Sequence, residues 1–337
     1  DAKSLISLER ARRKRFDGGW QDYQPPTPAC PGITVFDDVP LAELRAIIDW
    51  TPFFQTWELS GRYPQILDDA IVGKQARELF VDANAMLDQL IAERWLTAKA
   101  VAGLWPARSS GDDIEVFAPA AAVSGSNRRR AIATLHCLRQ QADKPEDRAN
   151  FSLADFIAPE ESGKCDWVGA FAVNAGIGIE PHVARFEAAY DDYNSILLKS
   201  LADRFAEACA EWLHLKVRRE LWAYAPDELL SAEQLVAEEY RGIRPAPGYP
   251  ACPEHSEKAT LFRLLDAENA IGLQLTENFA MLPASAVSGL YFSHPQSQYF
   301  VVGRIGREQV ADYARRKGVS LQQAERWLAP NLDYDPE

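Results

Sequence analysis

The stretch Val101-Ala-Gly-Leu-Trp-Pro-Ala-Arg-Ser-Ser-Gly-Asp-Asp-Ile-Glu-Val-Phe117 has the pattern of a β-hairpin. Its apolar ends, Val101–Pro106 and Ile114–Phe117, flank the polar, glycine-containing Ser109–Asp113, as two strands flank a turn. Hairpins join antiparallel strands, whereas parallel strands need a long crossover. This stretch therefore favours a sheet with antiparallel pairing.

Outside the hairpin, helical and extended patterns follow one another without the β–α–β rhythm of a parallel sheet. Apolar residues at three- and four-residue steps predict a helix over 74–96 and a long helix, in one or two parts, over 182–222. Further helices are predicted at 3–15, at 259–269 and in two short segments before Trp327, and strands at 130–138, 167–173, 275–281, 288–293 and 298–302. The expected fold class is α+β.

Composition excludes several classes of protein. The 337 residues are 47% hydrophobic and 25% charged, which rules out a disordered chain. No apolar run approaches the roughly 18 residues of a membrane-spanning helix. The net charge of −13 disfavours nucleic acid as a partner, because nucleic-acid affinity comes from Lys and Arg neutralising phosphates. The five scattered cysteines do not suggest a disulfide framework, and we expect reduced thiols in a cytoplasmic protein.

The chain carries no pattern for covalent or metal chemistry of its own. Cys252-Pro-Glu-His255 has a ligand-like spacing, but no second Cys/His pair completes a zinc site. Ala175-Gly-Ile-Gly178 lacks the third glycine of a dinucleotide fingerprint, and neither a phosphate loop nor a nucleophile elbow is present. We therefore expect no metal and no catalytic nucleophile on this chain.

The beginning of the chain differs from the rest. It starts with Asp1 rather than Met, which we interpret as a piece of a longer protein. The basic run Arg10–Arg15 precedes the proline-rich Gln24–Pro31, which favours an extended linker. Residues 1–32 are predicted to be a tether and residues 33–337 a single domain. The basic run, like Arg128–Arg130, is interpreted as a solvated face, with contact to an acidic partner as the alternative.

The segment Arg241-Gly-Ile-Arg-Pro-Ala-Pro-Gly-Tyr-Pro-Ala-Cys-Pro253 stands out for its four prolines and two glycines. Prolines restrict the backbone, so this loop is stiff. A stiff loop that presents Arg244 and Tyr249 suits a ligand with a carboxylate, held by the guanidinium. The alternative is a rigid structural crossover whose arginine pairs with a nearby acid, and the residues alone leave both open.

This loop is one of a series of motifs that follow in order along the chain: Ile48-Asp-Trp-Thr-Pro-Phe-Phe54, Trp57 with Gly61-Arg-Tyr-Pro64, Gly111-Asp-Asp-Ile114, Leu138-Arg-Gln-Gln141, Arg244-Pro-Ala-Pro-Gly-Tyr-Pro250, Glu254-His255 and Glu325-Arg-Trp-Leu-Ala-Pro-Asn-Leu332. Together they resemble the C-terminal activation domain of cobalamin-dependent methionine synthase, from about residue 33 to the end. Residues 1–32 resemble the tether that follows the cobalamin-binding domain, and Ala118–Arg130 looks longer than the family usually shows.

The resemblance implies a helmet-shaped α+β domain, with a twisted, largely antiparallel sheet flanked by helices, that binds S-adenosylmethionine (AdoMet) on its concave face. In that family, inactive cob(II)alamin returns to methylcobalamin with an electron from flavodoxin or a flavoprotein reductase and a methyl group from AdoMet. A neighbouring domain of the same polypeptide carries the cobalamin. The resemblance therefore implies a methyltransferase whose attacking atom lies outside this chain.

The resemblance also implies roles for single residues. Asp49 would hold the α-amino group of AdoMet, and Arg244 would hold its carboxylate, both through charge-assisted hydrogen bonds. Without the resemblance, Asp49 would be interpreted as a cap for the turn at Thr51-Pro52.

Other positions would shape the rest of the site. The resemblance implies that Ala246, Gly248 and Tyr249 form the loop wall beside Arg244. It also implies that the backbone of Tyr299 and Phe300 contacts the nucleoside, although the residues alone would indicate the core of a strand.

Two acidic residues, Glu207 and Glu238, match positions near the sulfonium of AdoMet, where negative charge stabilises the bound reactant. For Glu207 a solvated helix face is the alternative, because Asp203 and Glu211 continue the same stripe.

A second function is also compatible with the sequence. The chain could be a docking module for the cobalamin domain and the electron donor, with AdoMet binding secondary. That hypothesis predicts docking that survives Asp49→Asn and Arg244→Ala.

Overall fold

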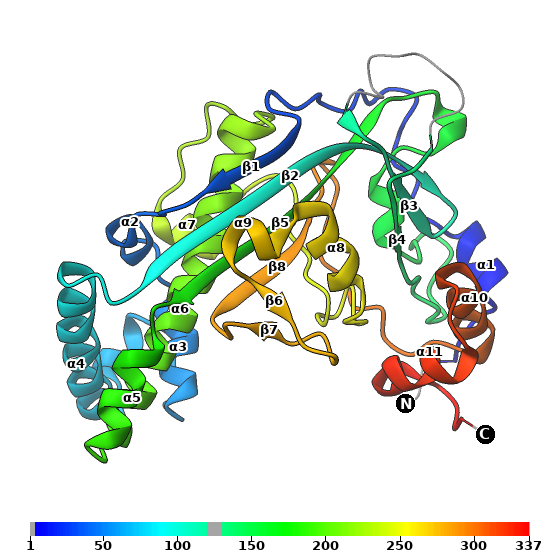
Figure 1. Cartoon of the computed structure of the whole chain (residues 1–337). Helices are drawn as coiled ribbons and strands as arrows, with labels where there is room; N and C mark the ends of the chain where they lie inside the picture. Colours follow the sequence, from blue (N-terminus) through cyan, green and yellow to red (C-terminus); the bar gives the residue numbers. More distant parts are fainter. Residues whose placement is uncertain (1–3, 120–129, 337) are drawn as a thin grey trace.

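The computed structural model describes residues 4–119 and 130–336 (Figure 1). Its main sheet has the order β4-β3-β2-β5-β8, with β1 also paired to β2, and each pairing is antiparallel. The strands are β1 (Gly32–Phe36), β2 (Thr97–Ser110), β3 (Asp113–Val116), β4 (Ala133–His136), β5 (Asp166–Ile177) and β8 (Ala286–Tyr291). The predicted α+β class with an antiparallel sheet is confirmed.

The hairpin that the sequence indicated joins β2 to β3. Its register pairs Ala107 with Val116 and Ser110 with Asp113, so the turn is Gly111-Asp112. Gly111 has a φ of +63°, a backbone conformation that glycine adopts without a side-chain clash. The hairpin therefore forms where the polar turn residues interrupt the apolar pattern.

The long strands β2 and β5 are buried on both faces, which explains their nearly continuous apolar sequence. Along β2, Ala100, Ala102 and Leu104 face one core, whereas Val101 and Trp105 face the other. The first face is covered by α2 (Leu41–Arg45), α3 (Trp50–Thr56), α4 (Gly73–Ala92) and α6 (Asp192–Lys216). The second face is covered by α8 (Glu257–Leu265) and α9 (Ala267–Ile271). Side chains alternate across a strand, so two covered faces require apolar residues at successive positions.

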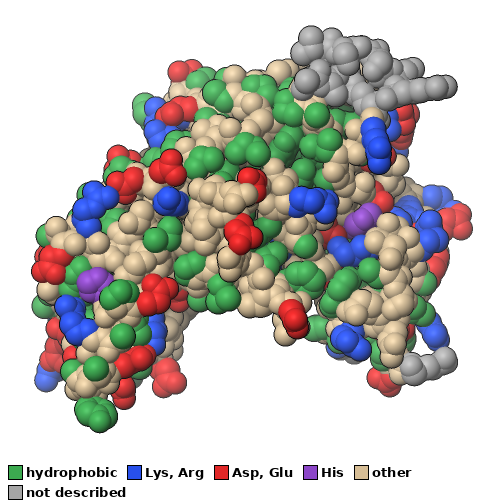
Figure 2. All heavy atoms as spheres, in the orientation of Figure 1, with side chains coloured by type: hydrophobic (Ala, Val, Ile, Leu, Met, Phe, Trp, Pro, Cys, Tyr) green, Lys and Arg blue, Asp and Glu red, His purple; other side chains and the backbone are tan. Residues whose placement is uncertain are grey.

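The helices surround the sheet as the resemblance led us to expect (Figure 1). They are α1 (Leu8–Arg13), α2 (Leu41–Arg45), α3 (Trp50–Thr56), α4 (Gly73–Ala92), α5 (Glu180–Ala188), α6 (Asp192–Lys216), α7 (Ala232–Val236), α8 (Glu257–Leu265), α9 (Ala267–Ile271), α10 (Arg307–Lys317) and α11 (Leu321–Trp327). Figure 2 shows a concave lower outline between the end with α4 and α5 and the end with α10 and α11, the shape of a helmet. No helix in the described ranges is long and apolar enough to cross a membrane.

Helix α6 forms the long apolar element predicted for 182–222. Asp191 caps its first turn by accepting a hydrogen bond from the backbone N–H of Asn194 at 3.1 Å. The helix ends in a π-helical turn, Val217–Leu221. The shorter α5 precedes it, so the predicted helix is in two parts, and the apolar stripe that includes Leu201 and Phe205 is fully buried against the sheet.

Three predictions near the C-terminus were wrong in detail. Residues 275–281 do not form one strand; instead β6 (Gln274–Leu275) pairs with β7 (Met281–Leu282) across a turn. Residues 298–302 form no strand, and β8 pairs with β5. The helix predicted for 259–269 breaks at Asp266, whose φ is +50°. The turn between β6 and β7 is closed locally, because the N–H of Thr276 donates to the carbonyl of Ala280 at 2.8 Å. The pairing of β8 with β5, by contrast, depends on residues that are distant in sequence.

Residues 4–31, which we expected to be an extended tether, lie against the body of the structure. The basic run holds this segment in place through ion pairs. Arg12 pairs with Asp112 at 2.8 Å and with Asp312 at 2.7 Å. Farther along, the Pro26 carbonyl accepts a hydrogen bond from the indole N–H of Trp222 at 2.9 Å. The arginines of this run thus serve internal ion pairs. Arg128 and Arg129, the other proposed basic patch, lie outside the described residues, as does most of Ala118–Arg130.

At the start of β5, a buried carboxylate makes the stability of the fold depend on pH. Asp166 is 3% exposed, and burial raises its pKa from 3.8 to about 7. The hydrogen bonds that its carboxylate accepts from the backbone N–H groups of Ala158 and Trp167 lower the pKa, but by less than burial raises it. Between these values the native state holds a proton that the unfolded state has lost, so stability falls as pH rises from about 4 to 7. The shift corresponds to about 4 kcal/mol in total.

Asp166→Asn should remove this dependence. The free energy of unfolding of the wild type and of the variant can be measured with urea at pH 5 and at pH 8. The wild-type value minus the variant value should be lower at pH 8 than at pH 5 by roughly 2 kcal/mol or more. Loss of a backbone hydrogen bond in the variant adds a constant that does not vary with pH. A difference that is the same at both pH values would contradict the assignment.

Candidate functional site

A cavity of about 500 Å³ lies beside β8, the edge strand of the main sheet. Its walls come from four regions: β5 and β8, helix α6, the loop that follows α7, and the segment 299–301. They contribute Phe171, Glu207, Glu238, Arg244, Pro245, Ala246, Tyr249, Pro250, Ala251, Val287, Tyr299, Phe300 and Val301. The structure thus brings together seven of the nine residues predicted for the site: Glu207, Glu238, Arg244, Ala246, Tyr249, Tyr299 and Phe300.

The proline-rich loop is held in place by β8 and by its own turn. Ile243 pairs with Phe292 just beyond the end of β8, and the Pro245 carbonyl accepts a hydrogen bond from the N–H of Leu290 at 2.9 Å. Gly248 then turns the chain with a φ of +95°, and its N–H donates to the carbonyl of Cys252 at 2.7 Å. The loop is therefore rigid, as its composition predicted.

Gly248 does not line the cavity, but its position has a steric requirement. A Cβ at this residue would lie 2.2 Å from Cε1 of His255. The backbone conformation at a φ of +95° also disfavours any other residue. Gly248 thus allows the turn that presents Ala246 and Tyr249 to the cavity.

Arg244 is anchored from behind by three side chains. Its Nη2 lies 2.8 Å from the Oε2 of Glu211, and its Nη1 donates to the Tyr240 hydroxyl at 2.6 Å and to Nδ1 of His214 at 3.2 Å. The arginine side chain is 17% exposed. Burial opposes its charge, but the carboxylate of Glu211 more than compensates, so the pKa of Arg244 lies above its ordinary value. The guanidinium stays charged beside the cavity.

The anchoring residues are themselves buried. Glu211 is 6% exposed; burial raises its pKa, and the charge of Arg244 acts in the opposite direction. Burial lowers the pKa of His214 well below its ordinary value, so the imidazole is neutral and its Nδ1 can accept from Arg244. The solvated helix face that we considered for this stripe is wrong for Glu211, and the exposed Asp203 accepts a hydrogen bond from the Ser285 hydroxyl.

The segment with Tyr299 and Phe300 lies opposite the loop. The hydroxyl of Tyr299 accepts a hydrogen bond from the backbone N–H of Arg244 at 3.0 Å, which links the two walls. Because 298–302 is not a strand, no described residue pairs with the backbone of Tyr299 or Phe300 through a hydrogen bond. Their main-chain donors and acceptors are available to a ligand.

Charge in the cavity is mixed. Glu207 comes from α6, and Glu238 follows α7 in a left-handed conformation with a φ of +55°. With Arg244 these two residues give one cationic and two anionic groups. Such a lining suits a ligand with one carboxylate and with positive charge elsewhere.

Asp49 is not among the residues that line this cavity. It is the N-cap of α3, and its carboxylate accepts a hydrogen bond from the backbone N–H of Thr51 at 3.0 Å. This is the turn-capping role that the residues alone suggested. Its proposed contact with an amino group remains a prediction.

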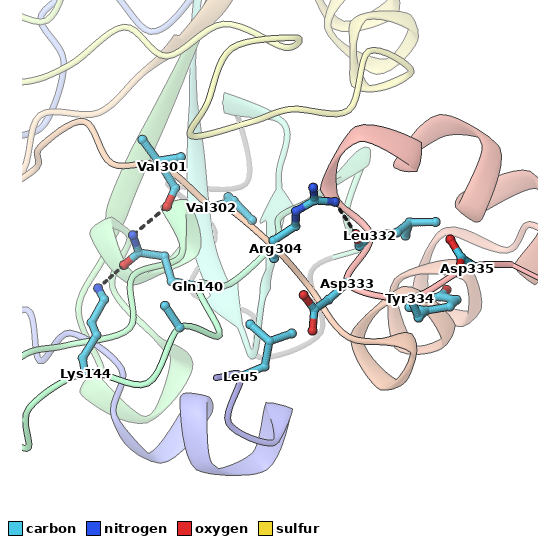
Figure 3. Close-up of a pocket in the computed structure, with 12 residues that line it drawn as sticks. Leu5, Gln140, Lys144, Val301, Val302, Arg304, Leu332, Asp333, Tyr334 and Asp335 are labelled. Atoms are coloured by element: carbon cyan, nitrogen blue, oxygen red, sulfur yellow. Dashed lines mark hydrogen bonds between the residues drawn. The ribbon is translucent and has the colours of Figure 1, made fainter. Parts of the chain in front are cut away.

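A larger cavity of about 700 Å³ lies on the other side of Val301, which lines both (Figure 3). Several of the polar groups drawn there serve the protein itself. The amide of Gln140 donates to the carbonyl of Val301, Lys144 donates to Gln140, and Arg304 donates to the carbonyl of Leu332. The smaller cavity, where Arg244 faces two acids, is the better candidate site.

Comparison with known proteins now identifies the family and supports the fold. The model of the family described as vitamin B12 dependent methionine synthase, activation domain, matches residues 40–318. The chain belongs to this family. A crystal structure of the MetH reactivation domain bound to AdoHcy is 53% identical in sequence, and the match covers 98% of this chain and 99% of that one with a TM-score of 0.93.

Membership of the activation-domain family confirms the resemblance found in the motifs, and with it the helmet-shaped α+β fold. The family is part of a methyltransferase, methionine synthase, and its function involves cobalamin. Sequence reasoning missed the roles of His214 and Tyr240, which anchor Arg244, and of Gly289 in β8, where a Cβ would lie 2.6 Å from the Pro245 carbonyl oxygen. Only the last of these had a signal, because an isolated glycine in a strand often marks a close backbone approach.

Proposed function

We propose that this chain binds AdoMet in the cavity beside β8 and supplies its methyl group for the reductive reactivation of methionine synthase. Within the longer enzyme, a neighbouring domain of the same polypeptide carries the cobalamin, and flavodoxin or a flavoprotein reductase supplies the electron. Support comes from the family and from the similar reactivation domain, whose crystal structure contains AdoHcy.

The residues present fit AdoMet. Its carboxylate matches Arg244, while its ammonium and sulfonium are positive groups that suit Glu207 and Glu238. The cavity of about 500 Å³ has the size of a small-molecule site. Phe171 and Val287 supply apolar walls for the nucleoside. The unpaired backbone N–H and C=O groups of residues 299–300 can form hydrogen bonds with its polar atoms.

The part played by this chain is binding and orientation. The loop and α6 hold the amino-acid end of AdoMet, which fixes the direction in which the methyl group leaves. Cobalamin, when docked, would supply the nucleophilic metal centre. Glu207 and Glu238 stabilise a sulfonium that loses its charge on transfer, so an over-tight pairing would oppose the reaction.

The decisive observation is the charged Arg244 held at the wall of a cavity that two acids also line. Calorimetric titration of the isolated chain should show saturable binding of AdoMet and of S-adenosylhomocysteine (AdoHcy). ATP, which has the same adenosine but a strongly negative chain, should not bind, because Glu207 and Glu238 repel it. Absence of heat with both adenosyl ligands, or equal binding of ATP, would refute the proposal.

A further inference from the structure

A row of buried charges of alternating sign leads from the protein interior to the cavity. Glu228 forms a bidentate ion pair with Arg218, in which the Nη2 of Arg218 lies 2.7 Å from the Oε1 of Glu228. The Nη1 of Arg218 lies 4.0 Å from Oε1 of Glu211, and the Oε2 of Glu211 lies 2.8 Å from Arg244. The order is thus minus, plus, minus, plus, and the last member faces the cavity.

All members of this row are withdrawn from solvent. The side chain of Arg218 is 0% exposed, that of Glu228 9%, that of Glu211 8% and that of Arg244 17%. A buried ion whose partner is removed is strongly unfavourable, so each charge depends on its neighbour. A ligand carboxylate against Arg244 would add the next negative charge and continue the alternation.

The hydrogen bonds of Arg244 also restrict where a ligand can bind. A guanidinium has five N–H donors. Tyr240 and His214 accept from Nη1, and Nη2 forms an ion pair with Glu211 at 2.8 Å. The remaining donors are Nε–H and the second hydrogen on Nη2, and no described residue accepts from Nε. These two can serve a carboxylate in the cavity.

We propose that Glu211 is a positioning residue for carboxylate recognition, which holds the Arg244 guanidinium so that its free donors face the cavity. The inference rests on the function proposed above and adds a residue that makes no contact with the ligand. Without the carboxylate of Glu211, Arg244 keeps only the neutral acceptors His214 and Tyr240. The carboxylates of Glu207 and Glu238, which line the same cavity, would then draw the guanidinium out of position. Ligands would then lose the interaction made by their carboxylate and keep the one made by their nucleoside.

The test compares two ligands that differ in the amino-acid group, which carries the carboxylate together with the ammonium. AdoHcy carries the amino-acid group, and 5′-deoxy-5′-methylthioadenosine is the same thioether nucleoside without it. Calorimetry on the full chain should show that Glu211→Gln weakens AdoHcy at least tenfold while methylthioadenosine changes less than twofold. Glu211→Asp, which retains the charge one methylene farther back, should recover part of the AdoHcy affinity.

The matched control is Glu220→Gln, which removes an exposed carboxylate that pairs with Lys216 from the π-helical turn after α6. It should change neither affinity. Equal weakening of both ligands in Glu211→Gln would indicate general loosening and overturn the inference, as would unchanged AdoHcy binding. If Glu211→Gln does not fold, the same two ligands are compared with Glu211→Asp. In that variant the affinity for AdoHcy is expected to fall at least threefold. Failure of the wild type to bind AdoHcy would refute the proposed function itself.

Discussion

Arg244→Ala should reduce the affinity for AdoMet and AdoHcy by at least about 100-fold. Hydrogen bonds between charged groups contribute about 1.5–3 kcal/mol each, and the proposed carboxylate contact uses the free donors of one guanidinium. The same change leaves the buried Glu211 with only Arg218, at 4.0 Å, and removing one member of a buried pair costs about 3–5 kcal/mol of stability. Calorimetry and urea unfolding measure the two effects separately.

Arg244→Lys distinguishes loss of binding from loss of folding. Lysine keeps a positive charge beside Glu211 but lacks the planar set of donors. This variant should retain most of its stability and still bind AdoHcy at least tenfold more weakly. Arg263→Ala, on the exposed side of α8, is the control and should alter neither property. AdoHcy affinity unchanged in Arg244→Ala would favour the docking module and remove the loop from the site.

Gly289→Ala should have the second largest effect on binding. Gly289 lies in β8 where the Arg244–Pro245 segment runs alongside, and a Cβ there would be 2.6 Å from the Pro245 carbonyl oxygen and 2.8 Å from the ring of Phe171. Backbone on one side and a buried ring on the other leave no room, so the loop must move away from the strand. We expect a loss of about 1–3 kcal/mol in stability and at least tenfold weaker AdoHcy binding.

The neighbouring Ser288→Ala is a matched control, because it changes a buried side chain of the same strand without adding an atom toward the loop. It should bind AdoHcy within about twofold of the wild type, a free-energy change well below 1 kcal/mol. The steric argument would be wrong if Gly289→Ala bound AdoHcy as tightly as Ser288→Ala does.

Local chemistry explains which elements could be predicted. The β2–β3 hairpin, the long helix α6 and the stiffness of the 241–253 loop depend on residues close in sequence: turn formers between apolar runs, an apolar stripe, and prolines. Most of the site residues came from the motif resemblance, and the cavity brings them together except for Asp49 and Gly248. Residues 298–302 have a strand-like pattern, but β8 takes β5 as its partner and they remain unpaired with any described strand.

The sequence by itself determined the α+β class, the antiparallel sheet, the stiff arginine-bearing loop and the family. Tertiary structure alone decided that the basic N-terminal run forms internal ion pairs and that Glu211 is buried beside Arg244. It also decided that the loop packs against β8 at Gly289, where no side chain is in the way. The physical reason is that burial and ion pairing depend on which distant segments meet. Neither the period of a helix nor the composition of a loop records that information.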